Sequence, residues 1–171
     1  GGVARIGAGG LHNLTVKTDR TVWGWGWNIY GEIGDGGVLT RANPVAVAGL
    51  SAITGVASGS QHNLAVKADG TVWAWGYNEY GQLGDGTMTD RSVPVVVPGM
   101  STATAVAAGA SHSLAVKADG SVWAWGDNEY GQLGDDTTVG RLTPVAVSGL
   151  SGVTAVAAGS MHSLALKADG T

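Results

Sequence analysis

A period of 50 residues organises the whole chain. Histidines stand 50 residues apart, and two tryptophans separated by one small residue recur at the same interval. The recurrent positions are His12, His62, His112 and His162, then Trp23 and Trp25, Trp73 and Trp75, and Trp123 and Trp125. Regular repetition at this length is typical of stacked supersecondary units, none of which can bury its apolar residues alone.

Three full repeats and part of a fourth divide the chain. We place them at residues 1–50, 51–100, 101–150 and 151–171, the last being the first half of a unit. All four are expected to form one domain. The sequence starts at Gly1 without a methionine and stops within a repeat, so we interpret it as a piece of a longer repeat array.

Composition argues against several kinds of partner and site. The chain contains 30 glycines and no cysteine, and its charged fraction is 13%. With a net charge of −4, it lacks the clustered Lys and Arg that nucleic-acid binding requires. No apolar run approaches the ~20 residues of a membrane span, so we expect no membrane insertion. Without cysteine the chain can form neither disulfides nor cysteine-ligated metal sites, and the absence of cysteine does not determine the cellular compartment.

Residues 51–100 show how one repeat is expected to fold. Short apolar runs and alternating segments predict four antiparallel strands, at 53–57, 62–67, 71–76 and 94–97. Between the second and third, Asp69-Gly70 tolerates the positive φ angles of a tight turn. Pro94 suits an edge strand. Helical periodicity is absent, which favours an all-β chain.

The central strands have two unlike apolar faces. Alternation places Trp73 and Trp75 on one face, and Val72 and Ala74 on the other. We expect large residues on one side of each sheet and Ala and Val on the other, so that unlike faces pack between neighbouring sheets. The fold class predicted is therefore an all-β propeller of four-stranded antiparallel blades, which leaves only short edges exposed.

A longer motif makes the pattern specific. Residues 119–126 read Asp-Gly-Ser-Val-Trp-Ala-Trp-Gly, and 128–135 read Asn-Glu-Tyr-Gly-Gln-Leu-Gly-Asp, with close counterparts in the other repeats. This motif resembles the repeat of the regulator of chromosome condensation family. The resemblance implies a seven-bladed propeller, of which this chain would supply about 3.5 blades. The remainder would come from a longer chain or from other copies.

Each repeated histidine begins a strand, and two readings of it are open. Equivalent positions in adjacent blades are normally too far apart to share one metal ion. We expect His12, His62, His112 and His162 to be structural, each bridging two backbone groups. The sequence thus predicts no metal site and no cofactor at these positions.

An aspartate precedes an arginine by six residues in each full repeat, as in Asp85 and Arg91. We expect an ion pair that holds the long loop in place. The alternative is calcium binding by the oxygen-rich loop, but its spacing does not match the EF-hand pattern.

The tryptophan pairs also allow two interpretations. Light sensing by clustered tryptophans occurs in this family, but it requires arginines interleaved with the rings. Here the pairs have no repeated arginine beside them, so we expect packing between blades. Trp27 differs, because Tyr77 and Asp127 occupy its position in the other repeats. It could be an exposed anchor.

Positions that vary between repeats mark the expected partner surface. In an up-and-down blade, the first-to-second and third-to-fourth turns emerge on the same face. Variable residues gather in these turns, and the candidates for partner contact are Trp27, Tyr77, Asp127, Leu39, Met88, Gln61 and Met161. We expect a protein partner to bind there, because aromatic anchors carry much of the energy of interfaces.

No catalytic residue is expected. The chain has no phosphate loop, no Ser-His-Asp order and no paired carboxylates. We predict a non-enzymatic protein-interaction scaffold. The near-identical repeats resemble bacterial members of the family, which implies an extracellular or cell-surface location. The alternatives are a structural module of a surface protein, an inhibitor like a β-lactamase inhibitor related to this family, or a nucleotide exchange factor for a small GTPase. Carbohydrate binding stays open, although no motif supports it.

Overall fold

The computed structural model describes residues 2–171, and its regular elements are all β-strands. Fourteen strands follow one another in a recurring order. They are β1 (Val3–Ala8), β2 (His12–Lys17), β3 (Val22–Gly26), β4 (Arg41–Ala46), β5 (Ile53–Ser58), β6 (His62–Lys67), β7 (Val72–Gly76), β8 (Arg91–Val96), β9 (Ala103–Ala108), β10 (His112–Lys117), β11 (Val122–Gly126), β12 (Arg141–Ala146), β13 (Val153–Ala158) and β14 (Ser163–Lys167).

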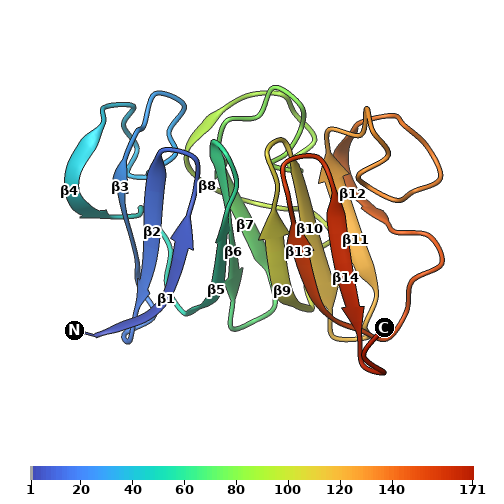
Figure 1. Cartoon of the computed structure of the whole chain (residues 1–171). Helices are drawn as coiled ribbons and strands as arrows, with labels where there is room; N and C mark the ends of the chain where they lie inside the picture. Colours follow the sequence, from blue (N-terminus) through green and yellow to red (C-terminus); the bar gives the residue numbers. More distant parts are fainter. Residues whose placement is uncertain (1) are drawn as a thin grey trace.

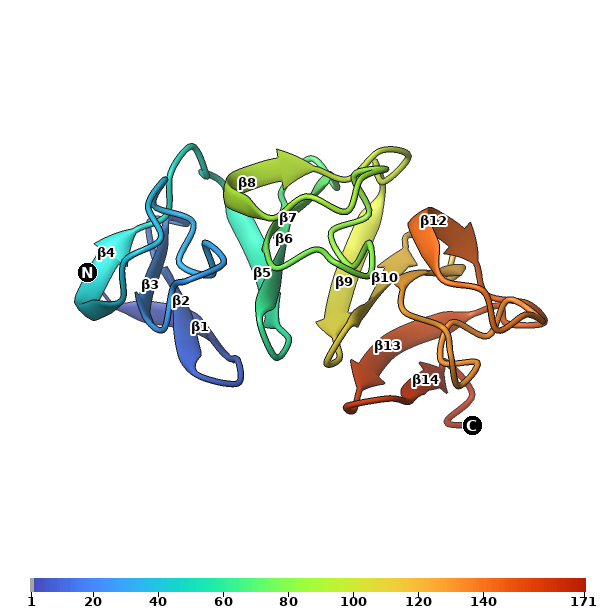
Figure 2. The same ribbon diagram turned by 90° about the horizontal axis from the view of Figure 1, so that it is seen from above.

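These strands form three four-stranded sheets and one two-stranded sheet. Within each sheet the strands pair antiparallel in chain order, as in β5-β6-β7-β8. The sheets stand side by side and fan out in an arc, with β1, β5, β9 and β13 along its inner side (Figure 2). We call the sheets blades 1 to 4. They confirm the predicted partial propeller of about 3.5 blades.

The fourth strand of blade 2 begins earlier than the sequence predicted. We expected 94–97, whereas β8 covers Arg91–Val96. Arg91 pairs with Gly76 beyond an irregularity in the ladder after Ala74. The strand lies at the outer edge of its sheet. Pro94 has no N–H to donate, but an edge strand can lack that donor without losing a hydrogen bond inside the sheet.

The tight turn between the second and third strands is as expected. Gly70 has a φ of 80°, and its N–H donates to the Lys67 carbonyl over 2.9 Å. The third strand begins at Val72, one residue later than predicted, because Thr71 caps the turn. Its N–H and hydroxyl both donate to the Asp69 carboxylate, at 3.0 and 2.6 Å.

The core lies between blades, but the distribution of side chains differs from our expectation. The register pairs Ala65 with Trp73 and Leu64 with Ala74. Ala65 therefore shares the tryptophan face and Leu64 shares the alanine face, so each face mixes large and small residues. Trp75 of blade 2 is fully buried against Leu14 and other residues of blade 1. Each blade thus completes the core of the blade before it.

Candidate functional site

Two sets of loops meet at one end of the blades. The β1–β2 and β3–β4 loops and their equivalents lie at the top in Figure 1, and the β2–β3 turns lie at the bottom. Backbone bonds join the two sets: Trp27 N–H donates to the Leu11 carbonyl over 3.0 Å, and Tyr77 N–H donates to that of Gln61 over 2.9 Å. We call this end the loop face, comprising 9–11, 27–40 and the equivalent residues 50 and 100 positions later, with 159–161.

All seven candidate partner residues lie on the loop face. Leu39, Met88 and Met161 are 69%, 59% and 54% exposed, and Trp27 is 40% exposed. The other three, Tyr77, Asp127 and Gln61, are half-buried. Their placement agrees with the prediction, whereas a role in binding stays a prediction.

Several exposed apolar side chains of this face were missed. Tyr130 is 64% exposed and Tyr80 is 47% exposed. Both occupy a position where every full repeat has tyrosine, so variation between repeats did not mark them. A signal was available, because a tyrosine inside a Gly-, Asn- and Asp-rich loop has little core to enter.

Tyrosines from neighbouring blades form a cluster. The ring centroids of Tyr30 and Tyr77 lie 4.6 Å apart, and those of Tyr77 and Tyr80 lie 6.3 Å apart in an edge-to-face arrangement. The Tyr77 hydroxyl donates to the Glu79 carboxylate. This hydrogen bond, reinforced by burial, raises the pKa of Tyr77 above its ordinary value.

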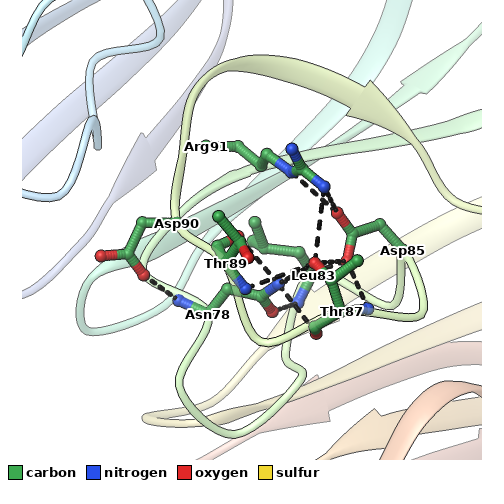
Figure 3. Close-up of polar contacts among 7 residues, drawn as sticks. All are labelled: Asn78, Leu83, Asp85, Thr87, Thr89, Asp90 and Arg91. Carbon is green, nitrogen blue, oxygen red and sulfur yellow. Dashed lines mark hydrogen bonds and ion pairs between the residues drawn. The ribbon is translucent and has the colours of Figure 1, made fainter.

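The long loop is held by a polar network (Figure 3). The Asn78 amide donates to the Thr87 and Thr89 carbonyls, each over 3.1 Å, and its oxygen accepts from Leu83 N–H over 2.9 Å. Since one side chain fixes three points of the loop, residues 78–89 form a defined surface.

The predicted ion pair completes that network. Arg91 donates to Asp85 Oδ2 through Nε and Nη2, both at 2.8 Å, while Thr87 donates to Oδ1. Burial acts to raise the pKa of Asp85, but the bonds from Thr87 and Arg91 outweigh it and hold that pKa below its usual value. Both carboxylate oxygens are occupied by donors within the loop, which argues against calcium at Asp85.

The repeated histidines connect consecutive blades. His62 Nε2 lies 2.9 Å from Ser113 Oγ, and Ser113 donates onward to the Gln82 carbonyl over 2.8 Å. Ser113 must therefore accept from His62, so His62 carries its proton on Nε2. The same Gln82 carbonyl accepts from Trp125 Nε1 over 2.8 Å. Our expectation that each histidine bridges two backbone groups was wrong for His12, His62 and His112, because the partner of each is a side chain 51 residues onward.

Burial keeps these rings neutral. Desolvation lowers the pKa of His62 to about 3, and it also lowers the pKa values of His12 and His112. His12 makes the equivalent contact to Asn63 over 2.8 Å, and His112 the contact to Ser163 over 3.1 Å. Within residues 2–171, no three His, Cys, Asp or Glu side chains are placed to hold a metal ion.

The six paired tryptophans divide into two structural classes. Trp75 and Trp125 are fully buried between blades, and Trp25, whose blade has no described neighbour on that side, is half-buried. Trp23 and Trp123 lie beneath the ammonium groups of Lys17 and Lys117, 3.3 and 3.8 Å from their ring centroids, and Trp73 is similarly paired with Lys67. These cation–π contacts, which lie near the turns opposite the loop face, were not predicted from the sequence.

The fourth blade has only β13 and β14, and His162 is exposed there. A cleft of about 320 Å³ lies beside it, lined by Leu114, Leu133 and Val156 among others.

Within residues 2–171 no helix is long and apolar enough to cross a membrane.

The model of the regulator of chromosome condensation (RCC1) repeat matches residues 19–66, 69–116 and 119–166. The chain belongs to this family. Each matched segment begins before the third strand of one blade and ends within the second strand of the next, so the family repeat spans two blades.

Solved RCC1-type structures share the fold. Human WBSCR16 is 26% identical with a TM-score of 0.86, over 98% of this chain and 45% of that one. Yeast RCC1 (Prp20), solved bound to Kap60, is 24% identical with a TM-score of 0.85, over 98% and 42%. The ultraviolet-B receptor UVR8 of Arabidopsis thaliana is 36% identical over 45 residues, which are 26% of this chain and 10% of the receptor. The chain therefore spans less than half the length of these proteins.

Proposed function

We propose that this chain is part of a non-enzymatic propeller that recognises a protein partner through its loop face. The observation that carries the proposal is the group of exposed apolar side chains, Trp27, Leu39, Met88 and Met161, on that one face. Apolar side chains gathered on one surface are typical of interaction sites.

The loops are suited to recognition because they are fixed before a partner arrives. Asn28, Asn78 and Asn128 each hold a loop through bonds to carbonyls 9 and 11 residues onward. A surface that is already ordered loses less conformational entropy on binding. The exposed apolar side chains of the loop face are therefore carried by loops of fixed conformation.

Relatives support this class of function. Yeast RCC1 has been solved with Kap60, and Prp20p of Saccharomyces cerevisiae has been studied for binding to Gsp1p and histones. RCC1-type propellers thus bind proteins, and we extend that general property to this chain without assigning it any of these partners.

The test uses a partner purified from the source organism by affinity to this chain. Its dissociation constant is measured for the wild type and for a Trp27→Ala, Leu39→Ala, Met88→Ala variant. We expect at least a tenfold loss of affinity. The matched control is Ala68→Lys with Ala118→Lys, which alters exposed residues of the opposite turns. Loss in the control and none in the loop-face variant would contradict the proposal.

Nucleotide exchange on a small GTPase is the second candidate, because the resemblance to the regulator of chromosome condensation family implies it. It predicts accelerated release of labelled GDP, which we do not expect from this chain. A location at a bacterial cell surface remains our proposal as well, and fractionation of the source cells tests it.

A further inference from the structure

Charge is divided unequally between the two ends of the blades. Most acidic residues lie on the loop face or beside it, whereas the basic residues there are three arginines. The acidic residues are Glu32, Asp35, Glu79, Asp85, Asp90, Asp127, Glu129, Asp135 and Asp136, which are nine of the chain's 13. The remaining four, Asp19, Asp69, Asp119 and Asp169, lie in the opposite turns, each two residues after one of the chain's four lysines.

The three arginines of the loop face are already engaged. Arg41, Arg91 and Arg141 pair with the aspartates six residues before them, at 2.5, 2.8 and 2.6 Å. These pairs neutralise three of the nine carboxylates. The other six have no basic partner on this face among the described residues.

Three positions that differ between the repeats come together between blades 1 and 2. Glu32 occupies a position where the other repeats have glutamine. Tyr77 occupies the position of Trp27 and Asp127. Asp90 occupies a position where the other repeats have threonine and glycine. The loop of blade 1 packs directly on the start of β8, since Gly36 N–H donates to the Ser92 carbonyl over 2.9 Å. This contact brings Glu32 towards Asp90.

Glu32 is fully buried, and half of its carboxylate is unpartnered. Oε2 accepts from Tyr30 N–H over 2.9 Å, whereas Oε1 has no hydrogen-bond partner. Burial raises the pKa of Glu32, and the charge of Asp90 adds to this effect. Burial likewise raises the pKa of Asp90, with a further contribution from Glu79. The charge of Asp90 thus acts on Glu32 and that of Glu79 acts on Asp90, and within residues 2–171 none of these three carboxylates forms an ion pair with a basic side chain.

The tyrosine cluster lies at the same place. Tyr30 belongs to blade 1, and Tyr77 and Tyr80 belong to blade 2. Aromatic ring faces attract guanidinium and ammonium groups, and carboxylates form their strongest hydrogen bonds with the same groups. Figure 3 shows the Asp90 carboxylate turned away from the Arg91–Asp85 pair, with one oxygen held by Asn78 N–H over 2.7 Å.

We propose that the junction of blades 1 and 2 binds an arginine- or lysine-rich segment of the partner protein, with Tyr30, Tyr77 and Tyr80 against the cationic groups and Glu79 and Asp90 as their counter-ions. Glu32 contributes negative potential from within the core. The inference rests on the proposed function, since it names the chemistry of the partner that the loop face recognises.

The test is fluorescence anisotropy with labelled nona-arginine, and with nona-glutamate as the peptide control. The decisive variant is Glu32→Gln with Asp90→Thr, which installs the residues of the other repeats. We expect nona-arginine to bind the wild type and to bind this variant at least tenfold more weakly. The matched control, Asp69→Asn with Asp119→Asn, changes the net charge equally on the opposite face and should leave affinity within twofold. Tryptophan emission verifies that each variant is folded.

A gain-of-function variant tests whether the weaker binding comes from the substituted residues themselves and not from general damage to the protein. Gln82→Glu, Asp127→Tyr and Gly140→Asp rebuild these three residues between blades 2 and 3. Introduced into the Glu32→Gln, Asp90→Thr background, they should restore at least half of the lost binding free energy. No recovery would count against the proposal.

Three results would overturn it: no binding of nona-arginine, equal weakening in both charge variants, or calcium binding by calorimetry that the Glu32→Gln, Asp90→Thr variant abolishes. Equal weakening would mean attraction by net charge alone. Should a purified partner depend on Trp27, Leu39 and Met88 but not on Glu32 and Asp90, this inference fails while the proposed function stands.

Discussion

Acid should weaken the contacts between blades through the buried histidines, and His62 allows the effect to be calculated. Its ring is fully buried, and burial lowers its pKa from 6.5 to about 3. In the unfolded chain this histidine takes up a proton below pH 6.5, whereas in the folded chain it stays neutral down to about 3. Stability is therefore present above pH 6.5 and is lost as the pH falls.

The magnitude follows from the difference between the two pKa values. For one proton, each pH unit below 6.5 lowers the free energy of unfolding by about 1.36 kcal/mol. His62 alone therefore lowers it by about 2 kcal/mol between pH 7 and pH 5. His12 and His112 act in the same direction, because burial lowers their pKa values too. Asp85 loses its contribution only at more acid pH, since its pKa is held below 3.8.

The assay is urea unfolding followed by tryptophan emission at pH 7, 6 and 5. The decisive quantity is the difference between wild type and His62→Gln at each pH, because Glu32 and Asp90 have raised pKa values and act in the opposite sense. Between pH 7 and pH 5, we expect the free energy of unfolding to fall by about 2 kcal/mol less in the variant than in the wild type. His162→Gln is the control, because that ring is exposed. Identical pH dependence in wild type and His62→Gln would refute the reasoning.

Three further predictions concern stability. Arg20 has a φ of 64° where the other repeats have glycine, so Arg20→Gly should raise the free energy of unfolding by about 1 kcal/mol; an unchanged or lower melting temperature would argue against strain. Asp85→Ala leaves donors of Arg91 and Thr87 unpaired and should cost about 1–3 kcal/mol by urea unfolding, whereas a neutral effect would show that the loop does not need this pair. Trp75→Phe removes a 2.9 Å bond from Nε1 to the Glu32 carbonyl and should cost about 1 kcal/mol or more. Trp25→Phe, at a half-buried ring, should cost clearly less, and equal costs would contradict the proposed packing.

The architecture was predictable because periodicity and turn chemistry act locally. Asp69-Gly70 marked its turn, and the 50-residue period determined the number of blades. The start of β8 was not predictable, since it depends on how Arg91 pairs with Gly76 across an irregular ladder. Such pairing is a property of two strands together.

The site was predictable in outline only. Variation between repeats located the loop face, and the spacing of Asp85 and Arg91 indicated their ion pair. The contact of His62 with Ser113 could not be inferred, because it joins residues of different blades. For the same reason, the proximity of Glu32 and Asp90 was not predicted from the sequence, because only the packing of blades brings these two residues together.

Hydrogen–deuterium exchange of the chain, alone and with its purified partner, tests the central claim most directly. Recognition through the loop face predicts that bound partner slows exchange in residues 27–40 and 77–90 and leaves the turns at 67–71 and 117–121 unchanged. Slower exchange confined to those opposite turns would contradict the account.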